Sequence, residues 1–102
     1  MHERFCRCRR GALGRIPKPV AISTLPKTEV MVPEPEGNGP PISLDLAEFE
    51  ALRLVELEGY PYCEAALSMG ISRNTVWRLV ESGKVKMITA ILEGRRLEIS
   101  HQ

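Results

Sequence analysis

The chain has 102 residues, 43% of them hydrophobic, and a formal net charge of +1 at pH 7. This length suits one small domain with a single modest core and leaves little room for a deep catalytic cleft. No apolar run reaches the length of a membrane span, and the basic N-terminus lacks the apolar stretch of a signal peptide. We therefore expect a cytoplasmic protein, whose three cysteines are reduced thiols.

The charges are segregated along the chain. Residues 1–27 hold seven basic residues against one acid, a net charge of +6. Residues 28–70 hold nine acids against one arginine, a net charge of −8, and residues 71–102 hold six bases against three acids, a net charge of +3. A phosphate backbone meets one local face of a protein, so the near-neutral total does not exclude nucleic-acid binding.

The first forty residues are predicted to be an arm and a linker. Seven of the eight prolines fall between Pro17 and Pro41, and they disfavour helix throughout this stretch. Two short runs, Val20–Ser23 and Glu29–Pro33, are β-prone, and one of them could pair with another strand. We expect residues 1–42 to form a basic, proline-rich arm and linker with a short strand, and residues 43–102 to form the main domain.

A first helix is predicted to begin after a cap at Ser43 or Asp45, because apolar residues then recur at helical spacing until Gly59. Its acidic residues lie on or near the outer face of this amphipathic pattern and are expected to be solvated. A paired-carboxylate site is the alternative, but no histidine or nucleophile accompanies the acids. The acidic residues concerned are Glu48, Glu50, Glu56 and Glu58.

Two further helices and a strand follow. A second helix fits Pro61–Met69 and ends at Gly70, and a third begins after Ser72. The third helix keeps an apolar stripe as far as Leu92, and Gly83 is expected to kink it. The inner face of the second helix is predicted to consist of Ala65, Ala66 and Met69. The stripe of the third helix consists of Val76, Leu79, Val80, Gly83, Met87, Ile88, Ile91 and Leu92.

The last predicted element is a strand at Arg96–Ser100, where polar and apolar residues alternate. A single strand needs a partner, which would come from the region of Val30 or from another subunit. Together these elements predict a mainly α fold, a three-helix bundle with a basic N-terminal arm and a short C-terminal β-strand.

The second and third helices match a helix-turn-helix, in which a short turn containing glycine joins two packed helices. Ala66 is small where the helices cross, and Gly70 can leave the helix in a left-handed conformation without strain. Ile71, Val76 and Leu79 would close the core between the two helices. The first half of the third helix would then be a recognition helix, which enters the major groove of DNA.

The polar residues of this helix would face outward and contact DNA. An arginine can bind guanine edges or phosphates, and an asparagine can make a bidentate contact with adenine. The Trp77 ring can lie against a thymine methyl group or a sugar, and Ser72 with the helix N-terminal amides can hold a phosphate. An ordinary solvated face, with Trp77 folded back onto the core, is the alternative. The predicted DNA-binding residues are Ser72, Arg73, Asn74, Thr75, Trp77 and Arg78.

The N-terminal arm is a second candidate for DNA contact. Arg4, Arg7, Arg9 and Arg10 could follow the phosphate backbone or enter a minor groove, or they could belong to a solvated terminus. His2, Cys6 and Cys8 suggest a metal site, but a closed zinc site needs four ligands, and the only further candidates, Cys63 and His101, are remote in sequence. We therefore expect no metal and no cofactor.

The chain from Leu44 to Ile99 resembles the small prokaryotic family of unknown function numbered 134, also called uncharacterised protein family 0251. This resemblance implies a helix-turn-helix similar to region 4 of the sigma-70 factors, a DNA-binding protein and a transcriptional regulator. The shared motifs are EALRL at Glu50–Leu54, LEG at Leu57–Gly59, EAA at Glu64–Ala66, MGISR at Met69–Arg73, and EG at Glu93–Gly94 followed by a basic and apolar tail.

The basic start at Arg4–Arg10 is also similar to the opening of that family. The chain departs from the family pattern at Pro61–Cys63, where polar helix-starting residues are expected, and at Gly83, where alanine is usual. No nucleophile, phosphate-binding loop or acid/base pair stands out, so we do not expect an enzyme.

The sequence therefore predicts a regulator that binds double-stranded DNA and forms a homodimer through the far half of the third helix and the terminal strand. The alternative is a protein-interaction module of the same fold, whose acidic first helix contacts a partner such as RNA polymerase and whose nucleic-acid contact is non-specific. RNA binding is a weaker third alternative, because no aromatic stacking platform is evident.

Overall fold

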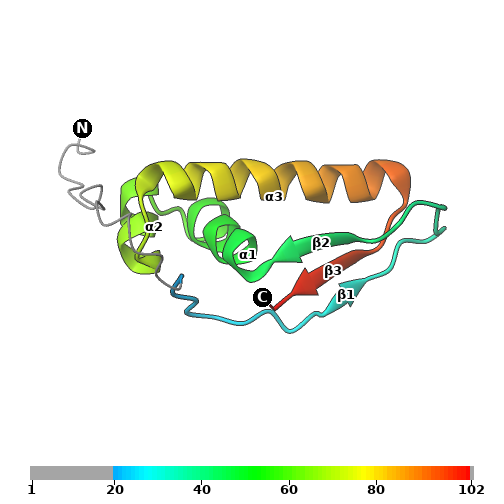
Figure 1. Cartoon of the computed structure of the whole chain (residues 1–102), viewed down its shortest axis with the longest axis horizontal. Coiled ribbons are helices and arrows are strands. Elements are labelled where there is room, and N and C mark those ends of the chain that lie inside the picture. The colour runs from blue at the N-terminus through cyan, green and yellow to red at the C-terminus, as the bar shows by residue number, and fades with distance from the viewer. Residues whose placement is uncertain (1–19, 102) are drawn as a thin grey trace.

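The structure is a computed structural model that describes residues 20–101. Three helices and a small sheet form the described part of the chain, with α3 lying along one side of the molecule (Figure 1). Helices α1 and α2 pack against the first part of α3, and the sheet lies beneath its second part. The elements in order are β1 (Val30–Met31), β2 (Ile42–Asp45), α1 (Leu46–Leu52), the π-helical segment η3 (Arg53–Leu57), α2 (Tyr62–Met69), α3 (Arg73–Glu93) and β3 (Leu97–Ser100).

The first helix begins later than its earliest predicted cap. Ser43 lies within β2, while Asp45 is the N-cap of α1 and forms a capping box with Glu48. The Asp45 backbone N–H donates to Glu48 Oε1 at 2.9 Å, which satisfies one of the free donors at the helix start. The helix continues as one π-helical segment, and Gly59, with φ of 78°, follows its end.

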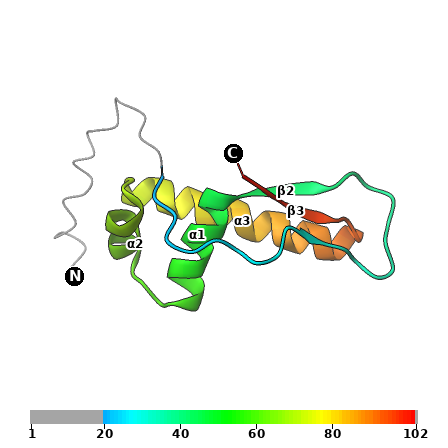
Figure 2. The ribbon, with the colours of Figure 1, turned by 90° about the horizontal axis from the view of Figure 1, so that it is seen from below.

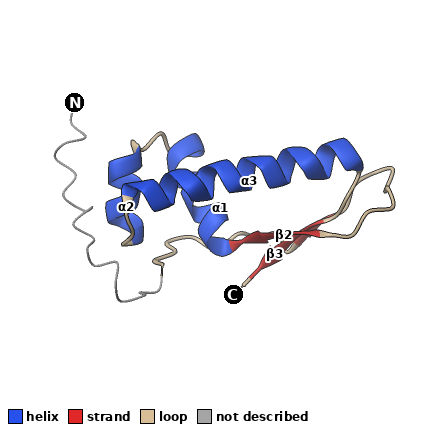
Figure 3. Ribbon diagram, turned by 45° about the horizontal axis from the view of Figure 1, so that its top comes forward, coloured by secondary structure: helices blue, strands red, loops and turns tan. Residues whose placement is uncertain are grey.

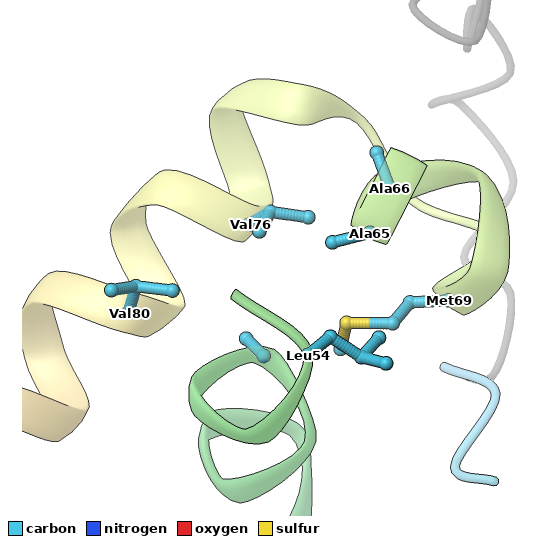
Figure 4. Packing of buried hydrophobic residues seen from close by; sticks show 7 residues of the cluster. Leu54, Ala65, Ala66, Met69, Val76 and Val80 are labelled. Atoms are coloured by element: carbon cyan, nitrogen blue, oxygen red, sulfur yellow. The ribbon is translucent and has the colours of Figure 1, made fainter. Parts of the chain in front are cut away.

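The core lies where the three helices meet. Small residues on α2 allow close approach, and Met69 fills the space between α2 and the end of the first helix (Figure 4). The predicted inner face of α2 is confirmed, because all three of its residues are fully buried. The buried cluster consists of Ala51, Leu54, Ala65, Ala66, Met69, Val76 and Val80.

The sheet has three strands in the order β1-β3-β2. Strand β3 pairs antiparallel with β1, where Met31 faces Leu97, and parallel with β2, where Leu44 faces Ile99. The predicted terminal strand and its partner near Val30 are therefore confirmed, whereas β2 was not predicted. Figure 2 shows β3 passing beneath the second part of α3, beside β2.

The other β-prone run, Val20–Ser23, forms no strand. It lies against the helical core instead, where the Ala21 backbone N–H donates to the Met69 carbonyl at 3.0 Å and Val20 packs against the buried cluster. A segment predicted to be part of a linker therefore closes one side of the core.

Helix α3 is continuous from Arg73 to Glu93, so the kink predicted at Gly83 is wrong. Gly83 is buried for another reason, because a Cβ atom there would lie 2.6 Å from Leu52 Cδ1 on α1. The glycine allows α1 and α3 to approach closely at their crossing point. Over residues 20–101, no helix is long and apolar enough to cross a membrane.

Two of the four acids of the first helix are buried, which corrects the prediction that all are solvated. Glu50 is fully buried and Glu48 is 4% exposed, whereas Glu56 and Glu58 are exposed as expected. The periodicity of one helix does not reveal that the 20–23 segment covers Glu50 and that α3 covers Glu48. Glu50 accepts hydrogen bonds from Ser23 Oγ at 2.6 Å and from Arg53 Nη2 at 3.1 Å.

Hydrogen bonds hold both buried carboxyls in the charged form. Burial alone would raise the pKa of Glu48, but hydrogen bonds from Lys86, Ser82 and the Asp45 backbone outweigh it and lower that pKa. The pKa of Glu50 is lowered in the same way, since burial is outweighed by hydrogen bonds from Ser23 and Arg53. These contacts join β2, α3 and the 20–23 segment to the first helix.

Candidate nucleic-acid interface

A three-residue turn sets the direction in which α3 leaves α2. Gly70 adopts the left-handed conformation with φ of 71° and ψ of 31°, as predicted, and its N–H donates to the Leu67 carbonyl at 3.3 Å. The next N–H, that of Ile71, donates to the Ala66 carbonyl at 3.1 Å. Both bonds satisfy carbonyl groups at the end of α2, so the turn is a fixed part of the fold.

The start of α3 is closed by its predicted cap. Ser72 has an extended backbone, and its Oγ accepts a hydrogen bond from the Thr75 N–H at 3.1 Å. The two hydroxyl groups also lie within hydrogen-bond distance, with 2.8 Å between Ser72 Oγ and Thr75 Oγ1. Ser72 and Thr75 therefore define the helix end, and the remaining predicted residues follow from it with helical spacing.

The first part of α3 has a buried face and an exposed polar face. Val76 and Val80 are fully buried against α1 and α2, and Leu79 is partly buried beside them. The predicted contact residues lie on the other side, and Figure 3 shows this part of α3 at the end of the molecule where α2 lies. The exposed residues are Arg73, Asn74, Thr75, Trp77 and Arg78, and Ser72 is partly buried.

Trp77 does not fold back onto the core. It is 48% exposed, and it stands on the outer side of α3 between the two arginines in sequence. The first turn of α3, residues 73–76, contains no acidic residue. Arg73 and Arg78 therefore project from a helix N-terminus that is itself partly positive, an arrangement that favours an anionic ligand.

The next turns of α3 carry charges that are already paired. Lys84 Nζ lies 3.0 Å from Glu56 Oε2 and 3.9 Å from Glu81 Oε2. Lys86 Nζ lies 2.8 Å from Glu48 Oε1 and donates to the Ser43 carbonyl at 2.7 Å. The lysines of α3 are thus committed to the protein itself, and the polar face is confined to the first part of the helix.

The apolar stripe of α3 is buried only in part, which corrects the predicted pattern. Val76, Val80 and Gly83 are buried, and Ala90, which was not predicted, is buried further on. The remaining positions turn away from the sheet, because the stripe drifts around the helix as it lengthens. The exposed apolar residues of the second part are Val85, Met87, Ile88, Ile91 and Leu92.

The other predicted contact residues, Arg4, Arg7, Arg9 and Arg10, lie outside the described residues, as do His2, Cys6 and Cys8. Within residues 20–101, no group of three or more histidine, cysteine, aspartate or glutamate side chains could hold a metal ion. Cys63 is a free, partly buried thiol on α2.

The fold and this face define a small, mainly helical protein that presents an exposed basic helix start. The model of the family described as "Protein of unknown function DUF134" matches residues 4–101, nearly the whole chain, so the chain belongs to this family. The resemblance inferred from the sequence motifs is thereby confirmed.

Relatives from archaea and bacteria support this membership. The UPF0251 protein of Archaeoglobus fulgidus is 45% identical over 87 residues, which cover 85% of this chain and 83% of that protein. A UPF0251 protein of Vibrio vulnificus is 37% identical over 92 residues, covering 88% of this chain and 92% of the relative. A UPF0251 protein of Pyrococcus horikoshii is 51% identical over 63 residues, but the match spans only 57% of its length. No solved structure matches the chain significantly.

Proposed function

We propose that the protein binds double-stranded DNA through the first part of α3 and acts as a transcriptional regulator. The observation that carries the proposal is the division of this helix. Val76 and Val80 are fully buried, so the helix is held in one orientation, and the polar residues beside them are free of the core. The α2, Gly70 turn and α3 unit is then a helix-turn-helix, with α3 as its recognition helix.

The exposed side chains have the chemistry that base and phosphate recognition needs. Arg73 and Arg78 can each donate two hydrogen bonds to a guanine edge or to a phosphate, and Asn74 can form a bidentate pair with adenine. Trp77 offers an apolar surface to a thymine methyl group. The similarity to sigma-70 region 4 and the contacts of the arginine-rich arm remain predictions from the sequence.

The test is selection of binding sites from a random duplex library, followed by affinity measurements on the enriched site. We expect an enriched motif for the natural protein and its loss in Arg73→Ala, Arg78→Ala. Each base contact removed should weaken binding about 10-fold or more, because a bidentate contact discriminates by about 1–3 kcal/mol.

A control with the same loss of charge separates base recognition from general attraction. Lys84→Ala, Arg96→Ala removes two positive charges that are paired with Glu56 and Glu36, away from the helix start. This control should keep the enriched motif and lose only part of the salt-dependent affinity. If all three proteins show the same weak, salt-sensitive retention without a motif, the proposal is wrong and the fold serves a protein partner, such as RNA polymerase.

A further inference from the structure

The second part of α3 exposes an apolar surface. Val85 is 63% exposed, Ile88 62%, Ile91 77% and Leu92 79%. These residues lie within two turns of helix and border one another at spacings of three and four residues. Single exposed apolar residues are normal on a protein surface, but a continuous group of this kind indicates an interaction site.

No charged side chain interrupts this surface. Between Val85 and Leu92 the only charged residue is Lys86, and it turns toward the sheet, where it binds Glu48 and the Ser43 carbonyl. Its side chain is only 30% exposed. The lysine that would otherwise keep this part of α3 solvated is therefore used inside the protein.

The apolar surface continues the face that carries the proposed DNA contacts. Residues seven apart occupy the same side of a helix, so Arg78, Val85 and Leu92 form one row and Asn74, Glu81 and Ile88 form the next. Because α3 is continuous, its outer side is polar at the start and apolar at the end. Whatever covers the apolar end also sets the position of the polar end.

We propose that a second copy of this chain covers the exposed apolar surface of α3, defined as Val85, Ile88, Ile91 and Leu92, with the two α3 helices parallel. Val85, Ile88 and Leu92 have the spacing of a coiled-coil seam, in which each residue meets the same residue of its partner across a two-fold axis. One uncharged patch is then complementary to itself, so no different partner surface is needed.

The length of the surface fits a weak dimer. Val85 to Leu92 spans about 10 Å of helix at 1.5 Å per residue, well below the area of a standard interface of about 800 Å² per partner. A dimer held by so short a seam should dissociate at low protein concentration and be favoured when two copies bind one duplex.

Charges beyond the surface limit the seam at its start. In a parallel pair, Glu81 and Arg78 would each meet the same charge on the partner, so the helices should separate before Val85. The two polar helix starts then lie at the same end of the dimer with a gap between them, as in helices that fork across a duplex. An antiparallel pair would place the helix starts at opposite ends. The parallel orientation rests on the proposed DNA binding, whereas the pairing itself does not.

The first test compares self-association by analytical ultracentrifugation over a range of concentrations, with and without the selected duplex. Ile88→Glu, Leu92→Glu should weaken self-association about 10-fold or more, because pairing would bury two unpaired charges in each copy. The control Leu25→Glu, Val32→Glu introduces the same charge at residues that are 64% and 56% exposed and lie outside α3. It should associate like the natural protein, and circular dichroism should show all three proteins folded.

The outcomes separate this inference from the proposed function. A natural protein that stays monomeric at every concentration, and binds its duplex one to one, overturns the pairing while DNA binding stands. A dimer that survives Ile88→Glu, Leu92→Glu overturns the assignment of the surface. If Arg73→Ala, Arg78→Ala still dimerises and no protein selects a motif, the pairing stands and the proposed function fails.

The orientation is tested with a photo-reactive p-benzoylphenylalanine in place of Val85 in the full chain. In a parallel dimer it should cross-link to residues near the partner's Val85, and mass spectrometry identifies the position. Cross-linking to the partner's Leu92, without products near position 85, would overturn the parallel arrangement.

Discussion

The two parts of α3 differ in what covers them, although one unbroken helix contains both. In the first part, the apolar side faces α1 and α2, and Val76 and Val80 are fully buried. In the second part, the inner side meets the sheet partly through the polar contacts of Lys86, and the larger apolar residues face outward. The comparison shows that helical periodicity identifies an apolar side but does not identify its partner.

The comparison predicts its largest effect for one substitution made in both parts. Val80→Asp should destabilise the protein by at least about 3 kcal/mol, because it buries an unpaired charge in the core. Val85→Asp, at a residue that is 63% exposed, should change the free energy of unfolding by about 0.5 kcal/mol or less. Urea denaturation at concentrations where the protein is monomeric measures both. Equal losses for the two variants would show that the second part is covered within the monomer.

The boundary between the two parts is expected to be sensitive to volume. Gly83→Val should cost about 1–3 kcal/mol, because the new side chain would overlap Leu52, whose Cδ1 lies 2.6 Å from the position of a Cβ atom. Adding Leu52→Ala should recover part of that loss, and thermal denaturation of the single and double variants measures the coupling. Strictly additive effects would mean that the two residues do not meet.

The inner side of the second part should depend on pH. Lys86→Met removes the hydrogen bond to Glu48 Oε1 and should cost about 1.5 kcal/mol near neutral pH. In the natural protein the pKa of Glu48 lies below its ordinary value of 4.5, so its contribution is complete above that pH and is lost as the pH falls through the lowered value.

Denaturation at a series of pH values checks this prediction. The variant should lose less stability than the natural protein between pH 4.5 and more acidic conditions, because Glu48 has one partner fewer. Parallel pH profiles for the two proteins would contradict a role of Lys86 in holding the charged carboxylate.

The smallest expected effect concerns the start of the first part. Ser72→Ala removes the cap that accepts the Thr75 N–H and should cost about 1 kcal/mol in the free energy of unfolding. Ser72→Asp is the matched control, since aspartate caps a helix equally well and should restore most of the stability. A stable alanine variant would show that the turn alone holds α3 in place.

Much of the helical part could be predicted from local sequence. Gly70, Ser72 and Gly94 mark helix ends because few other residues suit a left-handed turn or a side-chain cap, and the structure has them in those roles. Ala65 and Ala66 were identified as core because two small residues on one side of a short helix favour close packing.

The features that were missed depend on residues distant in sequence. Strand β2 has only four residues and lies between prolines and a helix cap, so its pairing with β3 leaves little local signal. The burial of Glu50 depends on Ser23, which lies 27 residues away, and the burial of Glu48 depends on Lys86. For the candidate site, the exposure of Trp77 could be anticipated only as one of two alternatives, because a large ring at that spacing fits either environment.

The position of β3 between β1 and β2 has a consequence for the order in which the protein can form during synthesis. Strands β1 and β2 are not neighbours in the sheet, and each pairs only with β3 among the described strands. Helices α1 to α3 can assemble as soon as they have left the ribosome, but neither of the earlier strands has a partner until Leu97–Ser100 has been made. We therefore expect the nascent chain to acquire its helical core first and to complete the sheet in a single late step.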